Sequence, residues 1–202
     1  MKIVLASASP RRKMLLEQIG MIPEILPSGV EEKVTKTAPE EVVKELSAMK
    51  AEDIAAGYGG SREDVLVIGA DTVVAAGSEI LGKPGDQAEA VKMIAMLAGT
   101  VHQVYTGVTM IRIKDGRTVD KCTFAEKTDV SVYPMTREEI EAYVASGEPM
   151  DKAGAYGIQG RFAAYIKGIS GDYSNVVGLP VGRTYQELKK WIDNASGGIL
   201  HD

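Results

Sequence analysis

Cysteine and histidine are nearly absent from this chain, and their scarcity excludes several kinds of site. The 202 residues include one cysteine, Cys122, and two histidines, His102 and His201. A single cysteine cannot form an internal disulfide, and these residues are too few for a cysteine-based zinc site or a His-rich metal site. Any metal is therefore expected to be a hard cation held by oxygen ligands, as Mg²⁺ is.

Long apolar runs and several common motifs are also missing. No stretch of 18 or more apolar residues occurs, so we expect no membrane span. The apolar stretch after Lys2 is too short for a signal peptide, and we expect a cytoplasmic protein. The sequence has no P-loop, no G-x-G-x-x-G fingerprint and no H-E-x-x-H motif. These absences argue against P-loop hydrolysis, dinucleotide redox chemistry and zincin chemistry.

The charge balance is mildly acidic. Lys and Arg number 23 against 28 Asp and Glu, giving a net charge of −5. Such a chain is not attracted as a whole to nucleic acid or to anionic membranes, and we expect neither partner. Phosphate binding would then require a local cluster of cations.

Helix and strand patterns alternate along the chain, with a hairpin in the middle. We therefore predict an α/β fold, a single domain over residues 1–195 with a long mixed sheet flanked by helices and two lobes around a central cleft. Residues 196–202 are predicted to form a frayed tail. The predicted strands cover 3–5, 65–74, 101–113, 119–133 and 162–166, with an extended stretch at 25–30. The predicted helices cover 11–19, 39–54, 86–97, 136–145 and 184–194.

The turn after the first strand is one candidate phosphate site. Ser7 and Ser9 lie beside Arg11 and Arg12, where the first helix begins with Pro10. A helix N-terminus has free N–H groups and a positive dipole end, and arginine binds phosphate oxygens in a bidentate manner. The alternative is an ordinary helix that Ser9 caps, with solvated arginines.

Asp71 is a second candidate, because it interrupts an apolar run from Val65 to Ala76. A carboxylate there is costly unless it is paired, bound to metal or hydrogen-bonded, and such groups concentrate at functional sites. The alternative is that Asp71 accepts hydrogen bonds from nearby backbone N–H groups. Glu31 and Glu32, Lys50 and Lys83 are weaker candidates when taken singly.

The stretch from Glu148 to Gly160 is the most unusual part of the sequence. Its glycines recur at three-residue steps and would let the backbone approach a ligand closely. The alternative is a tight loop that packs on the sheet.

Taken together, these segments resemble the Maf family of nucleoside triphosphate pyrophosphatases, within the wider Maf/Ham1 group. The matching stretches run in the family's order from one end of the chain to the other. They are residues 7–12, 29–32, 69–72, 82–84, 102–108, 126–128, 148–160 and 171–180. The resemblance implies an α/β domain with a cleft, hydrolysis of the bond between the α and β phosphates, and a homodimer. Gly171-Asp172-Tyr173 departs from the commoner Gly-Ser-Tyr of the family.

The resemblance also implies roles for individual residues. Arg11, Thr72 and Gln159 match the type that acts on dTTP and UTP. Asp71 and Glu32 are the expected ligands of a divalent cation, Mg²⁺ in the first place and Mn²⁺ or Co²⁺ as alternatives. The other expected site residues are Lys50 and Lys83, which with Asp71 are the expected catalytic groups, and Ser7, Ser9 and Arg12, which are expected to bind substrate.

Two other functions remain open at this point. One is a pyrophosphatase for 7-methyl-GTP or another non-canonical nucleoside triphosphate, which differs only in base choice. The other is a non-catalytic, nucleotide-binding regulator of septum formation. The apolar residues Val108, Met110 and Ile111 of the hairpin are candidates for a dimer interface, with plain core as the alternative.

Overall fold

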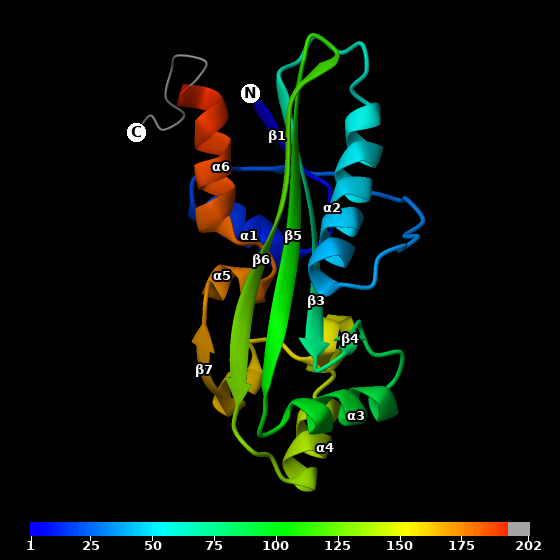
Figure 1. Cartoon of the computed structure of the whole chain (residues 1–202), viewed down its shortest axis with the longest axis vertical. Coiled ribbons are helices and arrows are strands. Elements are labelled where there is room, and N and C mark those ends of the chain that lie inside the picture. Colours follow the sequence, from blue (N-terminus) through cyan, green and yellow to red (C-terminus); the bar gives the residue numbers. More distant parts are fainter. Residues whose placement is uncertain (194–202) are drawn as a thin grey trace.

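A mixed sheet of seven strands organises the protein (Figure 1). The computed structural model describes residues 1–193, so the predicted tail at 196–202 and the predicted helix end at 194 lie outside the described residues. The strand order is β2-β1-β3-β5-β6-β7, with β4 paired to β3. β1 runs parallel to β2 and β3, and the other pairs are antiparallel, which confirms the predicted mixed α/β fold. The strands are β1 (Lys2–Leu5), β2 (Glu24–Ile25), β3 (Val65–Ala76), β4 (Glu79–Leu81), β5 (Val101–Lys114), β6 (Arg117–Val132) and β7 (Ile166–Ser170).

Helices cover both faces of the sheet (Figure 1). α2 lies along one face, whereas α1, α5 and α6 lie on the other, and α3 and α4 gather at the end opposite the β5–β6 turn. The largest core cluster joins the sheet to α1, α3, α4 and α6. The helices are α1 (Pro10–Gln18), α2 (Pro39–Ala56), α3 (Gln87–Leu97), α4 (Arg137–Ala145), α5 (Tyr173–Val177) and α6 (Val181–Asp193).

Local hydrogen bonds explain where several helices begin. The Asp86 carboxylate accepts from the Glu89 N–H and caps α3. Thr136 and Glu139 form the predicted capping box at α4, each side chain accepting from the other residue's N–H. At α1 the prediction is only partly right: Ser9 holds the N-cap position before Pro10, but its side chain makes no capping bond.

The predicted strand at 162–166 is wrong. Residues Arg161–Tyr165 form a 3₁₀ helix, and β7 follows at Ile166–Ser170. The reason is Phe162, which is fully buried against the rings of Tyr143 and Tyr156 and is turned toward them by the 3₁₀ backbone. Of the extended stretch predicted at 25–30, only Ile25 lies in a strand, β2. The elements β4 and α5 were not predicted, and α6 begins three residues earlier than predicted.

The hairpin residues proposed for a dimer interface belong to the core. Val108 and Met110 are fully buried and Ile111 is 3% exposed. Val108 and Met110 pack in the largest cluster, and Ile111 packs beneath α2 with Val65 and Val67. The interface alternative is therefore wrong for these residues, because neighbouring layers of the same chain cover both faces of β5.

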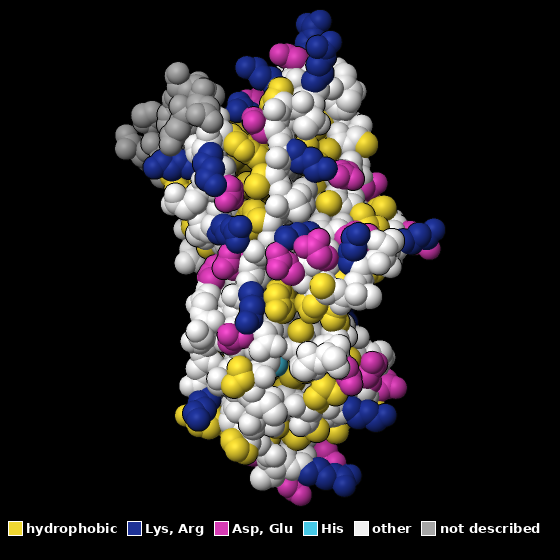
Figure 2. Space-filling model, in the orientation of Figure 1, with side chains coloured by type: hydrophobic (Ala, Val, Ile, Leu, Met, Phe, Trp, Pro, Cys, Tyr) yellow, Lys and Arg dark blue, Asp and Glu magenta, His cyan; other side chains and the backbone are white. Residues whose placement is uncertain are grey.

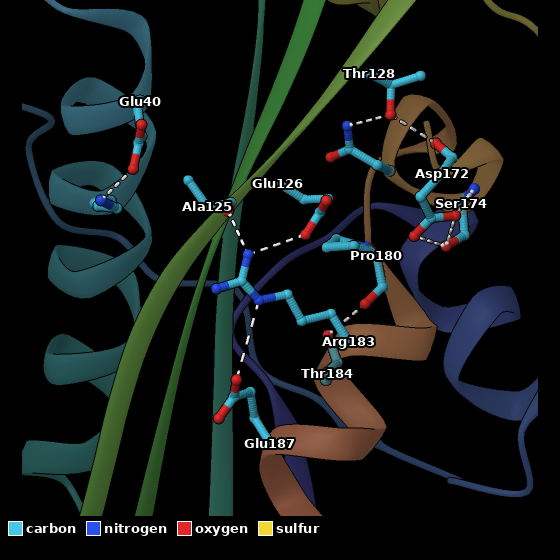
Figure 3. Close-up of polar contacts among 12 residues, drawn as sticks. Glu40, Ala125, Glu126, Thr128, Asp172, Ser174, Pro180, Arg183, Thr184 and Glu187 are labelled. Carbon is cyan, nitrogen blue, oxygen red and sulfur yellow. Dashed lines mark hydrogen bonds and ion pairs between the residues drawn. The ribbon is translucent and has the colours of Figure 1, made fainter. Parts of the chain in front are cut away.

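Polar contacts fasten the C-terminal helices to β6 (Figure 3). Arg183 of α6 donates to the Ala125 carbonyl at 2.9 Å and pairs with Glu126 at 3.0 Å. The Asp172 carboxylate accepts from the N–H and hydroxyl of Ser174, so it caps α5. Asp172 thus serves the fold, which explains why this chain tolerates a carboxylate at its departure from the family pattern.

Two glycines let α2 approach the sheet at backbone distance. A Cβ at Gly69 of β3 would collide with the Ser47 carbonyl, and a Cβ at Gly107 of β5 would collide with the Val43 carbonyl. Gly69 and Gly107 thus set the depth at which α2, and every side chain on it, lies against β3 and β5.

We expect Gly107→Ala to destabilise the protein by about 1–3 kcal/mol, because the added methyl must push α2 from the sheet. Chemical denaturation measures this change. Gly168→Ala is the matched control, since a Cβ on this edge-strand glycine would meet nothing within 4 Å. Equal stability of the two variants would contradict the close packing of α2.

Candidate functional site

A cavity lies where one edge of β3 is left without a partner strand. On that edge β1 pairs with Val65–Ile68 and β4 pairs with Val74–Ala76, so Gly69–Val73 has no strand beside it. β5 pairs with the opposite edge throughout. A cavity of about 770 Å³ opens at this gap, which is large enough for a nucleotide-sized ligand.

Consecutive residues of β3 can both line the cavity because it opens at the strand edge. Successive side chains of a strand point to opposite faces of the sheet. Asp71 points toward α2, where it meets Lys50, and Thr72 points toward α1, where it meets Arg12. At this gap, side chains from both faces of the sheet therefore line the same cavity.

An ammonium between two carboxylates forms the acidic part of the site. Lys50 Nζ lies 2.5 Å from Asp71 Oδ1 and 2.9 Å from Glu32 Oε1. The Lys50 and Asp71 side chains are 16% and 15% exposed, whereas Glu32 is 49% exposed. Among the described residues, the Asp71 carboxylate accepts hydrogen bonds from Lys50 and from no backbone N–H. Asp71 is thus stabilised by charge pairing, in contrast to the alternative of backbone hydrogen bonds.

Arg12 ties together three separate segments at the cavity wall. It donates to the Gly178 carbonyl at 2.8 Å, to the Ser7 hydroxyl at 3.0 Å and to the Thr72 hydroxyl at 3.1 Å. Burial lowers the pKa of Arg12, and the nearby Asp71 carboxylate opposes that shift. Ser7 also accepts from the Ser9 N–H, and the residues Ser9, Pro10 and Arg11, where α1 begins, line the cavity.

All the predicted site residues line this one cavity, although they come from six separate parts of the chain. Lys83 and Gln159 are exposed side chains on its wall, and Arg11 pairs with Asp151 at 3.3 Å. Their roles stay predictions, but their convergence is a structural finding. The cavity residues predicted beforehand are Ser7, Ser9, Arg11, Arg12, Glu32, Lys50, Asp71, Thr72, Lys83 and Gln159.

Sequence reasoning did not single out Asp151, Lys152 and Tyr156, which also line the cavity. Lys152 Nζ donates to the Glu148 carbonyl at 2.7 Å and to the Asp151 carboxylate at 2.6 Å. Asp151 in turn bonds Arg11, so it links the segment to α1 across the cavity. The available signal was their place inside the Gly-rich stretch.

The Gly-rich segment is both a tight loop and a cavity wall. Gly154 has a φ of +67°, and a Cβ there would lie 2.8 Å from Val74 Cγ2. A Cβ at Gly160 would collide with the Glu148 carboxylate. That carboxylate accepts from the Tyr143 hydroxyl at 3.1 Å and from the Arg161 N–H at 2.9 Å. Glycine is thus required where the segment touches β3, whereas a side chain at position 160 would displace the Glu148 carboxylate from its place.

A divalent cation such as Mg²⁺ fits the donor set of the cavity. Asp71 and Glu32 already converge on a single positive charge, the Lys50 ammonium. Among the described residues, no three His, Cys, Asp or Glu side chains come together. Mg²⁺ is held by one or two carboxylates plus substrate phosphates, whereas a complete protein cage needs more ligands. The two carboxylates therefore fit Mg²⁺ that binds together with an anionic substrate.

These features define an α/β protein with a cleft whose walls carry several cationic side chains and two carboxylates that share one lysine. The family model "Maf-like protein" matches residues 2–191. The dTTP/UTP pyrophosphatase of Agathobacter rectalis is 58% identical over 94% of this chain and 97% of its own. That of Lachnoclostridium phytofermentans is 50% identical over 94% and 95%. The chain belongs to the Maf family.

A solved structure gives a more distant likeness. The Ham1 protein of Staphylococcus aureus is 15% identical, covers 65% of this chain and 72% of its own, and has a TM-score of 0.39.

In the part of the chain that the structure describes, we find no helix of the length and apolar character that a membrane span requires. A band of acidic and basic side chains crosses the middle of the face in Figure 2.

We expect the free energy of unfolding to fall as the pH drops from about 6.5 to about 4. Burial lowers the pKa of His102 to about 4 from its usual 6.5. Between these values the unfolded chain binds the proton and the folded chain does not, so acid favours unfolding. The shift corresponds to about 3 kcal/mol, which is fully present as stability only above pH 6.5.

The measurement is urea unfolding across this pH range for the parent and for His102→Gln. The Gln variant has no group to titrate at this position. Between pH 6.5 and pH 4 its free energy of unfolding should therefore drop by about 3 kcal/mol less than that of the parent. Identical pH profiles for the two proteins would contradict a neutral, buried His102.

Proposed function

We propose that this chain hydrolyses nucleoside triphosphates, with dTTP and UTP as preferred substrates, to the nucleoside monophosphate and diphosphate. One observation carries the proposal: the mostly buried Asp71 carboxylate faces a nucleotide-sized cavity whose walls also present several cations. The names of the relatives from Agathobacter rectalis and Lachnoclostridium phytofermentans support the same reaction. Burial of an Asp at this position requires a charged partner, which Lys50 supplies.

The triphosphate is bound by cations and by a helix N-terminus. Arg11 and Lys83 line the cavity, and the first N–H groups of α1 border it. Because Ser9 makes no capping bond, its side chain does not compete with a phosphate for these N–H groups. Arg12 is already bonded to Ser7, Thr72 and Gly178, so it chiefly shapes the wall and adds positive potential.

The chemical step requires a base for the attacking water. Asp71 takes a proton from the water as its oxygen bonds to phosphorus, and the bond between the α and β phosphates breaks to release diphosphate. Lys50 and Lys83 offset the negative charge that develops on the phosphate oxygens. Asp71 and Glu32 would hold Mg²⁺, which supplies Lewis-acid polarisation of the phosphate when it is bound.

Base choice is assigned to Gln159. Uracil and thymine present O4 as an acceptor and N3–H as a donor. One amide can pair with both, because its NH₂ donates to O4 and its oxygen accepts from N3–H. Gln159 is exposed on the cavity wall. It lies in the segment where Gly160 packs directly on the Glu148 carboxylate. A single pyrimidine ring fits such a segment better than a purine does.

The decisive experiment is a panel of triphosphates with Mg²⁺, assayed for monophosphate and diphosphate. Turnover of UTP and dTTP above the others supports the proposal. Preferred turnover of 7-methyl-GTP or another non-canonical triphosphate favours the first alternative. Binding without turnover of any nucleotide favours the regulator of septum formation.

We further propose a cytoplasmic homodimer without nucleic-acid partners. Sedimentation would test the dimer, and filter binding would test the absence of nucleic-acid binding.

We expect Asp71→Asn to lose about 10²–10⁴-fold in kcat while keeping its fold, because the amide cannot accept the water's proton. Steady-state UTP hydrolysis at saturating Mg²⁺ measures the loss. Asp64→Asn is the matched control, since Asp64 also pairs with a cation, Arg112, but lies outside the cavity wall. Activity of Asp71→Asn within a few-fold of the control would contradict the role of Asp71.

We expect Gln159→Glu to lower the ratio of kcat/KM for UTP over CTP. A carboxylate would face the O4 acceptor of uracil with repulsion, whereas the N4 amino group of cytosine can donate to it. A good polar contact to a base edge contributes about 1–3 kcal/mol of discrimination. An unchanged ratio would assign Gln159 to the structure of the segment or to the ribose.

A further inference from the structure

The segment that carries Gln159 is attached to the sheet by a buried polar contact. The Tyr156 hydroxyl, three residues earlier in the chain, lies 2.8 Å from Nε2 of His102. His102 is fully buried on β5, and Tyr156 is 5% exposed. The two rings meet edge to face, with centroids 5.3 Å apart, a favourable aromatic geometry. This contact therefore fixes the segment to a central strand.

His102 and Tyr156 can form this hydrogen bond in either direction. Nδ1 of His102 is buried and has no hydrogen-bond partner among the described residues. Burial also lowers the pKa of His102 to about 4, so the ring is neutral at physiological pH. The neutral ring either donates from Nε2 to the Tyr156 oxygen or accepts there from the Tyr156 hydroxyl, so the contact is a hydrogen bond with either tautomer.

Gln159 depends on its neighbours for its position. Its side chain is exposed and makes no hydrogen bond to any described residue. On one side the segment is anchored by Tyr156, and on the other by the Arg161 N–H, which donates to Glu148 at 2.9 Å. We propose that His102 and Tyr156 are positioning residues for base selection, because their hydrogen bond holds Gln159 where its amide meets the pyrimidine.

This inference rests on the proposed function and on Gln159 as the group that reads the base. It predicts a separation between two kinetic effects. Asp71 and Lys50 lie on β3 and α2 and pair with each other, so the chemical step does not depend on the His102–Tyr156 contact. Loss of the contact should therefore act on base discrimination and on KM, and should leave kcat for UTP within about twofold.

The test is Tyr156→Phe, which removes only the hydroxyl. We expect the ratio of kcat/KM for UTP over CTP to fall about fivefold or more, through a higher KM for UTP. His102→Leu should have the same effect, and the double variant should be no worse than either single one. His102→Gln should restore the parental ratio, since its amide can either donate to the Tyr156 hydroxyl or accept from it.

Tyr165→Phe is the control, because Tyr165 packs on Phe162 at 5.7 Å in the same aromatic group but does not line the cavity. A parental ratio in Tyr156→Phe would overturn the inference, and so would a lower kcat for both substrates at an unchanged ratio. If His102→Leu does not fold, Tyr156→Phe alone decides. If the parent does not turn over UTP, the proposed function fails, and the ratio of dissociation constants for UTP and CTP decides the inference instead.

Discussion

The ion pair between Lys50 and Asp71 is the contact on which the arrangement of the cavity depends. It joins α2 to β3 close to the point where Gly69 and Gly107 bring the helix backbone onto the sheet. Both charged side chains are mostly buried. Removing Lys50 would leave the Asp71 carboxylate without a partner, which is costly, whereas removing Asp71 would leave Lys50 paired with Glu32. The close packing of α2 on the sheet and the position of the charged side chains in the cavity therefore depend on the same contact.

The elements of the fold that the sequence predicts are those whose causes are local. The hydrogen bonds that begin α3 and α4 join residues three apart in the chain. The residue types at Asp86, Thr136 and Glu139 therefore predict these two helix starts directly. The error at Phe162 has a different origin. Its partners Tyr143 and Tyr156 come from other segments, and their packing overrides the strand propensity of the residues around it. A strand as short as β4 has no periodicity to detect.

The candidate site divides in the same way. Asp71 is visible in the sequence because a charge interrupts an apolar strand, whereas the pairing of Lys50 with it exists only once α2 packs on β3. The Gly-rich pattern marks the segment that contains Gln159, but Gln159 itself became a candidate only through resemblance to a family. His102 gave no signal, because a single polar residue in a strand pattern is indistinguishable from a satisfied core residue until Tyr156 is placed against it.

The unpaired edge of β3 has a consequence for aggregation. An open sheet edge offers backbone N–H and C=O groups to any passing strand, and natural proteins protect such edges with charge and with short length. Here the open stretch Gly69–Val73 is bounded by β1 and β4, and Asp71 stands in its middle with Lys50 against it. The same charged pair that lines the cavity thus keeps a foreign strand from completing the sheet. An apolar residue in place of Asp71 would remove this protection, so the side chain proposed as the catalytic base also protects the sheet edge.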